Sequence, residues 1–355
     1  MYLRLQYSRA RARFAREIIQ RLGARQSTIL HLERGQAECE IKFSRNELYS
    51  KLISVVSIHA RDMIQEGHTF AVRYLYTVEN VILDSLTGMV FSIDGKIVAE
   101  SSSWPVSHLL LNSIPKPPPA KRLKKISNTS TILLPSNGFY HWLIEDLPLF
   151  LFISKQLGSY SLLEYENSPP YVRSLQSKNK NIISTPRFVH LDRYSFISRG
   201  GDTEWAHPKD IRTLRGAFAD LMQAQEPGKK IYISRLNSSR SPVFEKVLTE
   251  LLKSQGWEIL STEKMALHEQ IKRISSAEII CGVHGAGLAG MVWLSRGSQV
   301  IELSPENFVP CFSRLSEVCG MRYQRIPFPE KLPGNSYKIA NEIHNVIRHN
   351  HKNAD

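Results

Sequence analysis

Apolar and polar positions alternate most regularly in the second half of the chain, from residue 229 onward. Short apolar runs are separated by segments whose apolar residues recur every three or four positions, the period of an amphipathic helix. The predicted strands are 231–234, 257–260, 278–283 and 299–303, and the predicted helices are 243–252, 267–274 and 288–294. Strands that alternate with helices in this way predict an α/β fold with a parallel sheet covered on both faces.

The first half of the chain has a different pattern. Residues 70–103 are rich in β-branched and aromatic side chains and predict paired strands. A proline-rich connector at 114–119 precedes a predicted buried strand at 131–134. Helical spacing of apolar residues then predicts helices over 140–157 and 209–224.

The N-terminal segment, residues 1–25, carries seven arginines and one acidic residue, Glu17. Its apolar residues can line one face of a helix. This pattern predicts either a basic amphipathic helix on an anionic membrane surface or a solvated terminal helix, and the sequence favours neither.

Length and composition indicate a soluble globular protein. The 355 residues are 42% hydrophobic and 22% charged, and this length favours two domains. We place an N-terminal domain at 26–205, a C-terminal domain at 206–330 and a tail or helix at 331–355. No apolar stretch reaches the ~18 residues that span a bilayer, and the arginine-rich start lacks the apolar core of a secretory signal. A cytoplasmic location is therefore expected.

The formal net charge of +13 favours an anionic partner: a nucleic acid, a membrane surface or a phosphorylated substrate. No zinc-finger, RNP-like or KH motif is present, so nucleic acid is disfavoured. None of the four cysteines forms a CxxC pair, which disfavours a structural zinc site. The sequence also lacks the GxSxG and P-loop motifs of other enzyme classes.

A small-residue turn is the most informative feature. His284, Gly285, Ala286 and Gly287 directly follow a short apolar run, and a helix-compatible segment begins at Leu288. Backbone N–H groups at such a turn are open to an anion, and the dipole of the following helix favours negative charge. The predicted ligand is a phosphate or diphosphate, with the histidine donating to a phosphate or to a sugar hydroxyl. A tight turn capped by a histidine is the structural alternative.

Further charged residues follow the other predicted strands. Arg235 and Arg240 come after the strand at 231–234 and can clamp a diphosphate through charge-assisted hydrogen bonds, or can be solvated loop residues. Glu263 follows the predicted strand at 257–260, and Glu302 lies at the end of the strand at 299–303. Either glutamate can bind ribose hydroxyls, or be a simple strand-end charge. Because parallel strands end at one edge of a sheet, these side chains are expected to converge there.

The predicted helix that begins near Asn137 carries candidate acid–base residues. His141 and Glu145 are four positions apart and share one helical face, so the carboxylate can orient the imidazole as a general base; Asp146 is adjacent. The same spacing suits two metal ligands, but no third ligand motif accompanies it. An aromatic packing helix, kinked at Pro148, is the structural alternative.

Taken together, these pieces resemble glycosyltransferase family 61. The matching segments are 140–148, 233–235 with Arg240, 269–271, 282–288 and 300–303. They occur in the family's order over residues 135–305 and are more specific together than any one alone. The residues before this region carry no resemblance.

The resemblance implies a GT-B architecture, in which two Rossmann-like domains face each other across a cleft. It implies inverting transfer of a sugar from a nucleotide donor, usually UDP-linked, to a hydroxyl of a glycan or lipid-linked glycan. No metal or other cofactor is expected, since GT-B enzymes commonly use positive side chains and a helix dipole instead. Eukaryotic members begin with a membrane anchor that is not seen here. This difference points to a bacterial member that serves capsule or lipopolysaccharide assembly at the inner membrane face.

The resemblance and the strand-end pattern together assign roles. The base is expected to be Glu145, with His141 and Asp146 as alternatives. The residues expected to bind the donor diphosphate are Arg235, Arg240, His284, Gly285, Ala286, Gly287 and Leu288. A different class of protein, a non-catalytic binder of nucleotide-sugars or polyanions, would keep these arginines and the turn but lack a working base.

Overall fold

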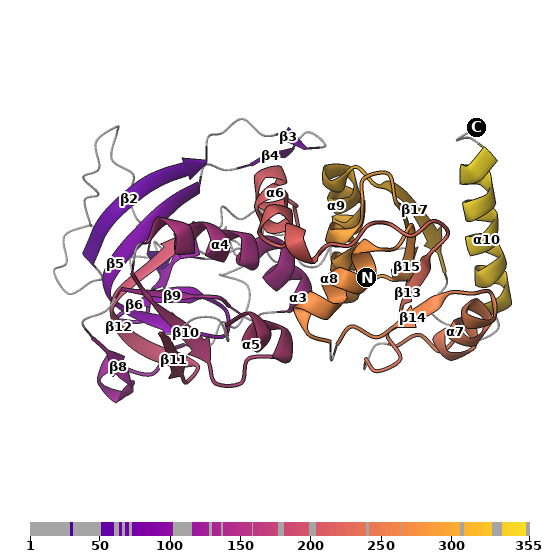
Figure 1. The fold of residues 1–355 in the computed structure, drawn as a ribbon. Helices are drawn as coiled ribbons and strands as arrows, with labels where there is room; N and C mark the ends of the chain where they lie inside the picture. Colours follow the sequence, from indigo (N-terminus) through magenta and orange to yellow (C-terminus); the bar gives the residue numbers. More distant parts are fainter. Residues whose placement is uncertain are drawn as a thin grey trace, which may run out of the picture. The chain divides into compact units, whose positions relative to one another are not determined.

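A computed structural model describes fifteen stretches of the chain (Figure 1). They are residues 29–30, 51–59, 64–65, 68–70, 73–101, 116–127, 130–135, 138–157, 159–176, 181–198, 204–238, 241–263, 265–305, 309–328 and 336–352. The basic segment 1–25 lies outside them, so its predicted helix stays a prediction.

The chain forms two compact units. Unit 1 comprises Met1–Asn137, Glu145–Val172 and Gln176–Thr203, and unit 2 comprises Gly138–Ile144, Arg173–Leu175 and Glu204–Asp355. Unit 2 therefore includes two short segments from the middle of the chain, which a linear division of the sequence does not anticipate.

Among its described residues, unit 1 is built on a ten-stranded sheet in the order β1-β7-β6-β5-β12-β9-β10-β11, with β2 paired to β5 and β8 paired to β12. The strands are β1 (Ile29–Leu30), β2 (Lys51–His59), β5 (Arg73–Asp84), β6 (Met89–Ser92), β7 (Ile97–Val98), β8 (Lys125–Ile126), β9 (Thr131–Leu133), β10 (Ser161–Tyr165), β11 (Ile182–Thr185) and β12 (Phe188–Ile197). Strands β3 (Ile64–Gln65) and β4 (His68–Thr69) form a separate pair. The helical elements are η1 (Ala99–Ser101), η2 (Ala120–Arg122), α4 (Leu147–Gln156) and α5 (Pro170–Gln176).

The sheet of unit 1 is mixed. Strands β2, β5, β6 and β12 pair antiparallel, whereas β12, β9, β10 and β11 pair parallel. The turn between β5 and β6 includes Gly88, whose φ of 76° suits glycine. A connection this short can only join antiparallel strands. The paired strands predicted over 70–103 are confirmed, while a Rossmann-like first domain is not.

Unit 2 contains a five-stranded parallel sheet in the order β14-β13-β15-β16-β17. The strands are β13 (Lys230–Ile233), β14 (Glu258–Leu260), β15 (Ile279–Val283), β16 (Gln299–Ser304) and β17 (Arg322–Pro327). The helical elements are α3 (Phe139–His141), α6 (Pro208–Ala217), η4 (Ala219–Leu221), α7 (Glu245–Ser254), α8 (Leu267–Ser275), η5 (Ala286–Trp293), α9 (Cys311–Cys319) and α10 (Ser336–Lys352).

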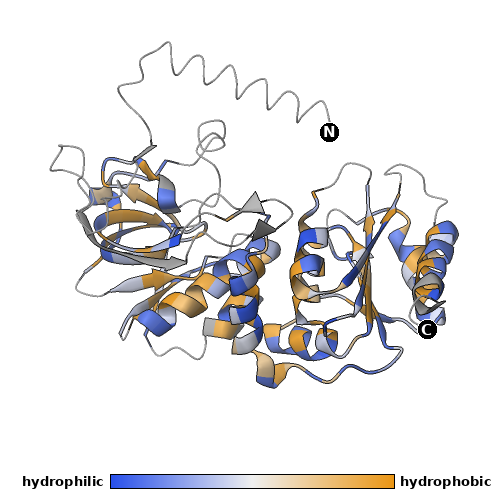
Figure 2. Ribbon diagram, turned by 90° about the horizontal axis from the view of Figure 1, so that it is seen from above, coloured by the Kyte–Doolittle hydropathy of each residue, from blue (hydrophilic) through white to orange (hydrophobic). Residues whose placement is uncertain are grey.

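Helices cover both faces of this sheet (Figures 1 and 2). On one face, Cys281 of β15 lies in a buried cluster with Leu248 of α7 and Ile343 of α10. On the other, a Cβ at Gly282 would lie 3.1 Å from Leu288 of η5, so the 3₁₀-helix packs directly on β15. The predicted parallel sheet is thus confirmed. The sequence analysis did not predict β17 or α9.

Candidate active site

The strand order of unit 2 creates one topological switch point. The chain runs from β13 to β14 on one side of β13, and then returns to β15 on its other side. In an open parallel sheet, ligands bind at the carboxyl ends of the strands at such a point, because the two connections leave in opposite directions. Arg235 follows β13 and His284 follows β15, so the switch point joins two of the predicted site residues.

Arg235 is held in place by its backbone and by its side chain. The backbone N–H donates to Oε1 of Glu245 over 2.5 Å, and Nη1 of the guanidinium donates to the carbonyl oxygen of His284. The arginine therefore bridges the ends of β13 and β15. A positive charge is fixed between two strand ends, where the sequence analysis expected a diphosphate.

A buried carboxylate organises the loop after β13. Glu245, in the first turn of α7, is fully buried and also accepts hydrogen bonds from Ser241 Oγ over 2.8 Å and from Tyr232 Oη over 3.4 Å. Burial, and then the Glu245 carboxylate, raise the pKa of Tyr232 well above its usual value. Glu245 is not among the residues predicted for the site, because an acid in a helix's first turn is ordinary and nothing in its spacing links it to Arg235.

At two glycines of the turn an added Cβ would force a neighbouring side chain to shift. A Cβ at Gly285 would lie 2.7 Å from Nη1 of Arg235, and a Cβ at Gly287 would lie 2.9 Å from Cγ2 of Ile233. Since φ of Gly285 is 166°, an extended conformation open to any residue, its small size is what matters. Glycine at these positions lets the turn approach the end of β13 closely.

The turn continues into a 3₁₀-helix rather than an α-helix. The amide of Leu288 donates to the carbonyl oxygen of Gly285 over 3.0 Å, which is the first bond of η5. The N–H groups of Ala286 and Gly287 come before this bond and have no acceptor within the helix. They are the groups that can meet an anion, whereas the Leu288 side chain is buried against β15.

His284 is held from behind by two residues of neighbouring strands. Its Nδ1 is hydrogen-bonded to Oε1 of Glu302, and Tyr323 Oη donates to Oε2 of the same carboxylate over 2.5 Å. The Glu302 side chain is fully buried, while the His284 side chain is 27% exposed. Phe312 contacts the imidazole edge-on, with ring centroids 5.3 Å apart. Both oxygens of the Glu302 carboxylate are thus engaged by protein side chains, and its predicted ribose contact stays a prediction.

The remaining donor-side predictions differ in outcome. Glu263 lies in the exposed loop after β14, close in sequence to Thr262, whose Oγ1 lies 3.3 Å from the Cβ position of Gly287. Its ribose contact stays a prediction. Arg240 lies outside the described residues.

The predicted acid–base residues lie on one continuous helical segment, but its geometry differs from the prediction. Between α3 and α4, residues Trp142–Asp146 form a π-helical turn. Such turns insert an extra residue and are frequent at functional sites. The regular i,i+4 geometry predicted for His141 and Glu145 is therefore interrupted. The helix begins after Gly138, whose φ of 79° suits glycine, and the predicted cap Asn137 is outside the described residues.

Within unit 2, α3 packs against η5. Tyr140 contacts Phe312 edge-on, with centroids 5.6 Å apart, and Phe312 in turn contacts His284. His141 follows directly in the chain, so its segment is joined to the His284 turn through one aromatic side chain. This proximity of residues distant in sequence could not be foreseen from spacing.

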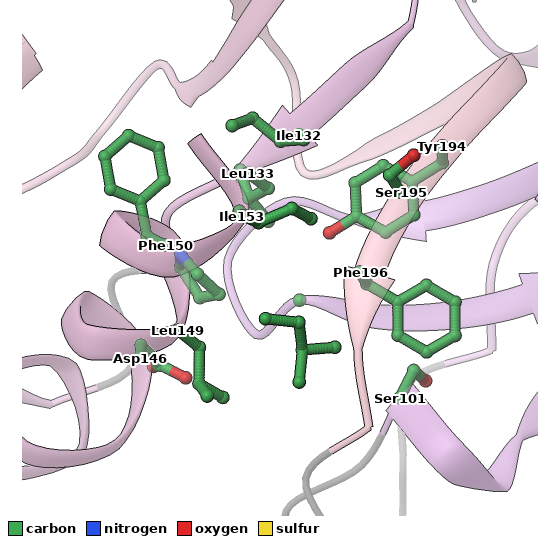
Figure 3. Close-up of a pocket in the computed structure, with 13 residues that line it drawn as sticks. Ser101, Ile132, Leu133, Asp146, Leu149, Phe150, Ile153, Tyr194, Ser195 and Phe196 are labelled. Atoms are coloured by element: carbon green, nitrogen blue, oxygen red, sulfur yellow. The ribbon is translucent and has the colours of Figure 1, made fainter. Parts of the chain in front are cut away.

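Asp146 belongs to unit 1, where it lines a small cavity of about 40 Å³ (Figure 3). The walls come mainly from apolar side chains of α4, β9 and β12, such as Phe150, Ile132 and Phe196. A water occupies roughly 30 Å³ in the liquid, and pockets for small ligands run to ~300 Å³ or more. As formed by the described residues, this cavity suits water rather than a sugar.

Residues 139–301 match the family described as Glycosyltransferase 61. The match supports the resemblance seen in the sequence and a glycosyltransferase activity. No curated protein matched the chain.

The family 61 match runs from α3 to β16. It covers the π-helical turn, Arg235 and the glycine turn, and it ends one residue before Glu302. Tyr323 lies well beyond it. Two of the residues that form the support of His284 therefore come from outside the matched segment.

Across the described stretches, none of the helices is both long and apolar enough to cross a membrane. Within the same stretches, no three His, Cys, Asp or Glu side chains converge as a metal site would require.

Proposed function

We propose that this protein is an inverting glycosyltransferase that moves a sugar from a nucleotide diphosphate donor, with UDP as the first choice, to a hydroxyl of a glycan or lipid-linked glycan. The observation that carries the proposal is the fixed guanidinium of Arg235 beside the first N–H groups of η5 at the switch point. A cation and helix-terminal amides at one sheet edge form a favourable site for a diphosphate.

The reaction is a single displacement. The acceptor oxygen forms a bond to the anomeric carbon of the donor sugar, while the bond from that carbon to the diphosphate oxygen breaks. The electron pair of the broken bond leaves with the diphosphate, and the proton of the acceptor hydroxyl passes to a base. Inversion follows because the acceptor attacks from the side opposite the leaving group.

The chain's own residues can stabilise the negative charge that grows on the leaving diphosphate. Arg235 supplies a guanidinium, and Ala286 and Gly287 supply backbone N–H groups. Arg240 is proposed as a second cation and Glu263 as the ribose ligand. Loss of one such donor from a preorganised site typically lowers kcat by about 10²–10³.

For the base we propose Glu145 first, with His141 and Asp146 as alternatives. Glu145 is half-buried, and Asp146 is only 3% exposed. A carboxylate that is partly accessible can reach a substrate hydroxyl. General-base catalysis contributes roughly 10²–10⁴ in rate, so Glu145→Gln should lower kcat by an amount in this range.

The GT-B arrangement, the cytoplasmic location and the attachment to an anionic membrane surface all stay predictions. So do the bacterial type and a role in capsule or lipopolysaccharide assembly. They rest on the sequence resemblance and on the basic segment 1–25.

The decisive experiment is a thermal-shift panel of UDP, GDP, CMP and ADP, each with and without Mn²⁺, followed by donor turnover. Stabilisation by UDP supports a UDP-sugar donor, and stabilisation by GDP or CMP keeps the class but changes the donor. No response to any nucleotide would refute the proposal. Stabilisation without any hydrolysis or transfer would favour the non-catalytic binder.

Turnover also tests whether Glu145 is the base and whether the reaction needs a metal ion. Glu145→Gln should lose turnover while still binding nucleotide, whereas the exposed Glu166→Gln should behave as wild type. EDTA should leave the activity intact, because positive side chains replace the metal in this proposal. Complete loss of activity that Mn²⁺ restores would contradict the metal-independent mechanism.

A further inference from the structure

The support behind His284 determines which of its nitrogens carries the proton. The Glu302 carboxylate is fully buried between two partners, the Nδ1 of His284 and the hydroxyl of Tyr323. A carboxylate only accepts hydrogen bonds, so the hydrogen between it and the imidazole belongs to Nδ1. In a neutral imidazole with Nδ1 protonated, Nε2 carries a lone pair and accepts a hydrogen bond.

Tyr323 fixes the carboxylate in this orientation. Burial, and then the Glu302 carboxylate, raise the pKa of Tyr323, so its hydroxyl remains protonated and donates. Both oxygens of Glu302 are thereby occupied by donors from β17 and from the turn after β15. A buried carboxylate that accepts a hydrogen bond at each oxygen holds both of its partners in one geometry.

The acceptor at Nε2 suits a hydroxyl and not a phosphate. A lone pair repels the oxygens of a diphosphate, whereas a sugar hydroxyl can donate to it. The His284 side chain is 27% exposed, which leaves it accessible to a ligand. Arg235 donates to the carbonyl of the same residue, so the imidazole lies next to the proposed diphosphate site, where the transferred sugar would be attached.

We propose that Glu302 and Tyr323 are positioning residues that hold His284 as its Nδ1–H tautomer, so that Nε2 accepts a hydrogen bond from a hydroxyl of the transferred sugar. This inference rests on the proposed function. It assigns the side chain of His284 to recognition of the donor sugar, whereas the sequence predicted that it binds the diphosphate. The diphosphate is then left to Arg235 and the backbone N–H groups.

The key variant is Glu302→Gln, which keeps the shape of the side chain. When its amide oxygen accepts from Tyr323, its NH₂ group donates to Nδ1 and the imidazole proton moves to Nε2. The imidazole then presents a donor to the sugar hydroxyl in place of an acceptor. Loss of an outer residue that orients a histidine typically costs 10–100-fold in affinity or activity where this has been measured at metal sites.

Two measurements test the inference. The first is isothermal titration with UDP and with four UDP-sugars: UDP-glucose, UDP-galactose, UDP-N-acetylglucosamine and UDP-xylose. Glu302→Gln should lower the affinity for the UDP-sugar that the wild type binds best by about 10–100-fold and leave the affinity for UDP unchanged. Tyr323→Phe should act in the same direction more weakly. Nitrogen-15 NMR of the imidazoles, with His284 assigned by its loss in His284→Gln, should show protonated Nδ1 in the wild type and protonated Nε2 in Glu302→Gln.

A matched control is Glu258→Gln, which removes a carboxylate from the same sheet where it accepts from Arg273 over 2.7 Å. It should alter neither the preference for UDP-sugar over UDP nor the His284 spectrum. The inference would be overturned if Glu302→Gln lowered the affinities for UDP and for UDP-sugar equally, or if Nε2 of His284 were protonated in the wild type. Failure of the wild type to bind any of these nucleotides would instead refute the proposed function, while the NMR measurement still reports the tautomer.

Discussion

Replacement of Gly285 by alanine tests whether the Arg235 guanidinium is the diphosphate ligand. The added Cβ would lie 2.7 Å from Nη1 and 2.8 Å from Cζ of Arg235, whereas ordinary contacts begin at 3.4 Å. The guanidinium must therefore withdraw by roughly 0.7 Å to reach a normal packing distance. Because the backbone at residue 285 is extended, alanine adds no backbone strain.

The expected cost can be estimated from the bond that is lost. A displaced guanidinium gives up its hydrogen bond to the carbonyl of His284 and its alignment with a bound diphosphate. Hydrogen bonds to charged groups contribute about 1.5–3 kcal/mol, which corresponds to a Kd about 10–150-fold higher. Global stability should change little, since Arg235 is only partly buried.

Isothermal titration with UDP, alongside thermal unfolding, measures both quantities. The matched control is Gly216→Ala on α6, where an added Cβ meets nothing within 4 Å. Arg235→Gln should raise the Kd for UDP to a similar extent. The variant that carries both substitutions should have a Kd little higher than either single variant, because the two changes remove the same interaction. A Gly285→Ala protein that folds and binds UDP as tightly as the wild type would refute the reasoning.

Three further predictions concern the interior of unit 2. Glu245→Ala leaves the Arg235 N–H, the Ser241 hydroxyl and the buried Tyr232 hydroxyl without their acceptor and should lower the free energy of unfolding by about 3 kcal/mol; a urea midpoint equal to that of wild type would contradict this. Gly290→Ala places a Cβ 2.6 Å from Cδ1 of Ile274 and should cost about 1–3 kcal/mol, and Ile274→Val, which removes that atom, should restore the stability. Burial raises the pKa of Cys311 and of Cys319 from 9.0 to about 12. Their protonated forms therefore stabilise the fold below pH 9, and this contribution is lost as the pH rises toward about 12. Alkylation at pH 8, followed by peptide mass spectrometry, should find both thiols slow to react until urea unfolds the protein.

The sequence alone determined much of unit 2. Four of its strands and the parallel sheet followed from apolar runs that alternate with helical periods, since both patterns are local. The sequence also predicts the ends of β13 and β15 as candidate ligand-binding positions, because Arg235 and His284 directly follow those strands. Strand β17 has the sequence RYQRIP with Ile326 as its buried residue, and is too polar for an apolar run to reveal it.

Tertiary structure decided the rest. Strand order set β13 beside β15 and so made a single switch point, which no local pattern specifies. The acceptors that fix the site, Glu245 for Arg235 and Glu302 for His284, depend on which side chains share a buried space. The mixed sheet of unit 1 and the π-helical turn also depend on non-local packing. Sequence periodicity reports the face on which a residue lies, whereas a buried hydrogen bond requires two residues to meet in three dimensions.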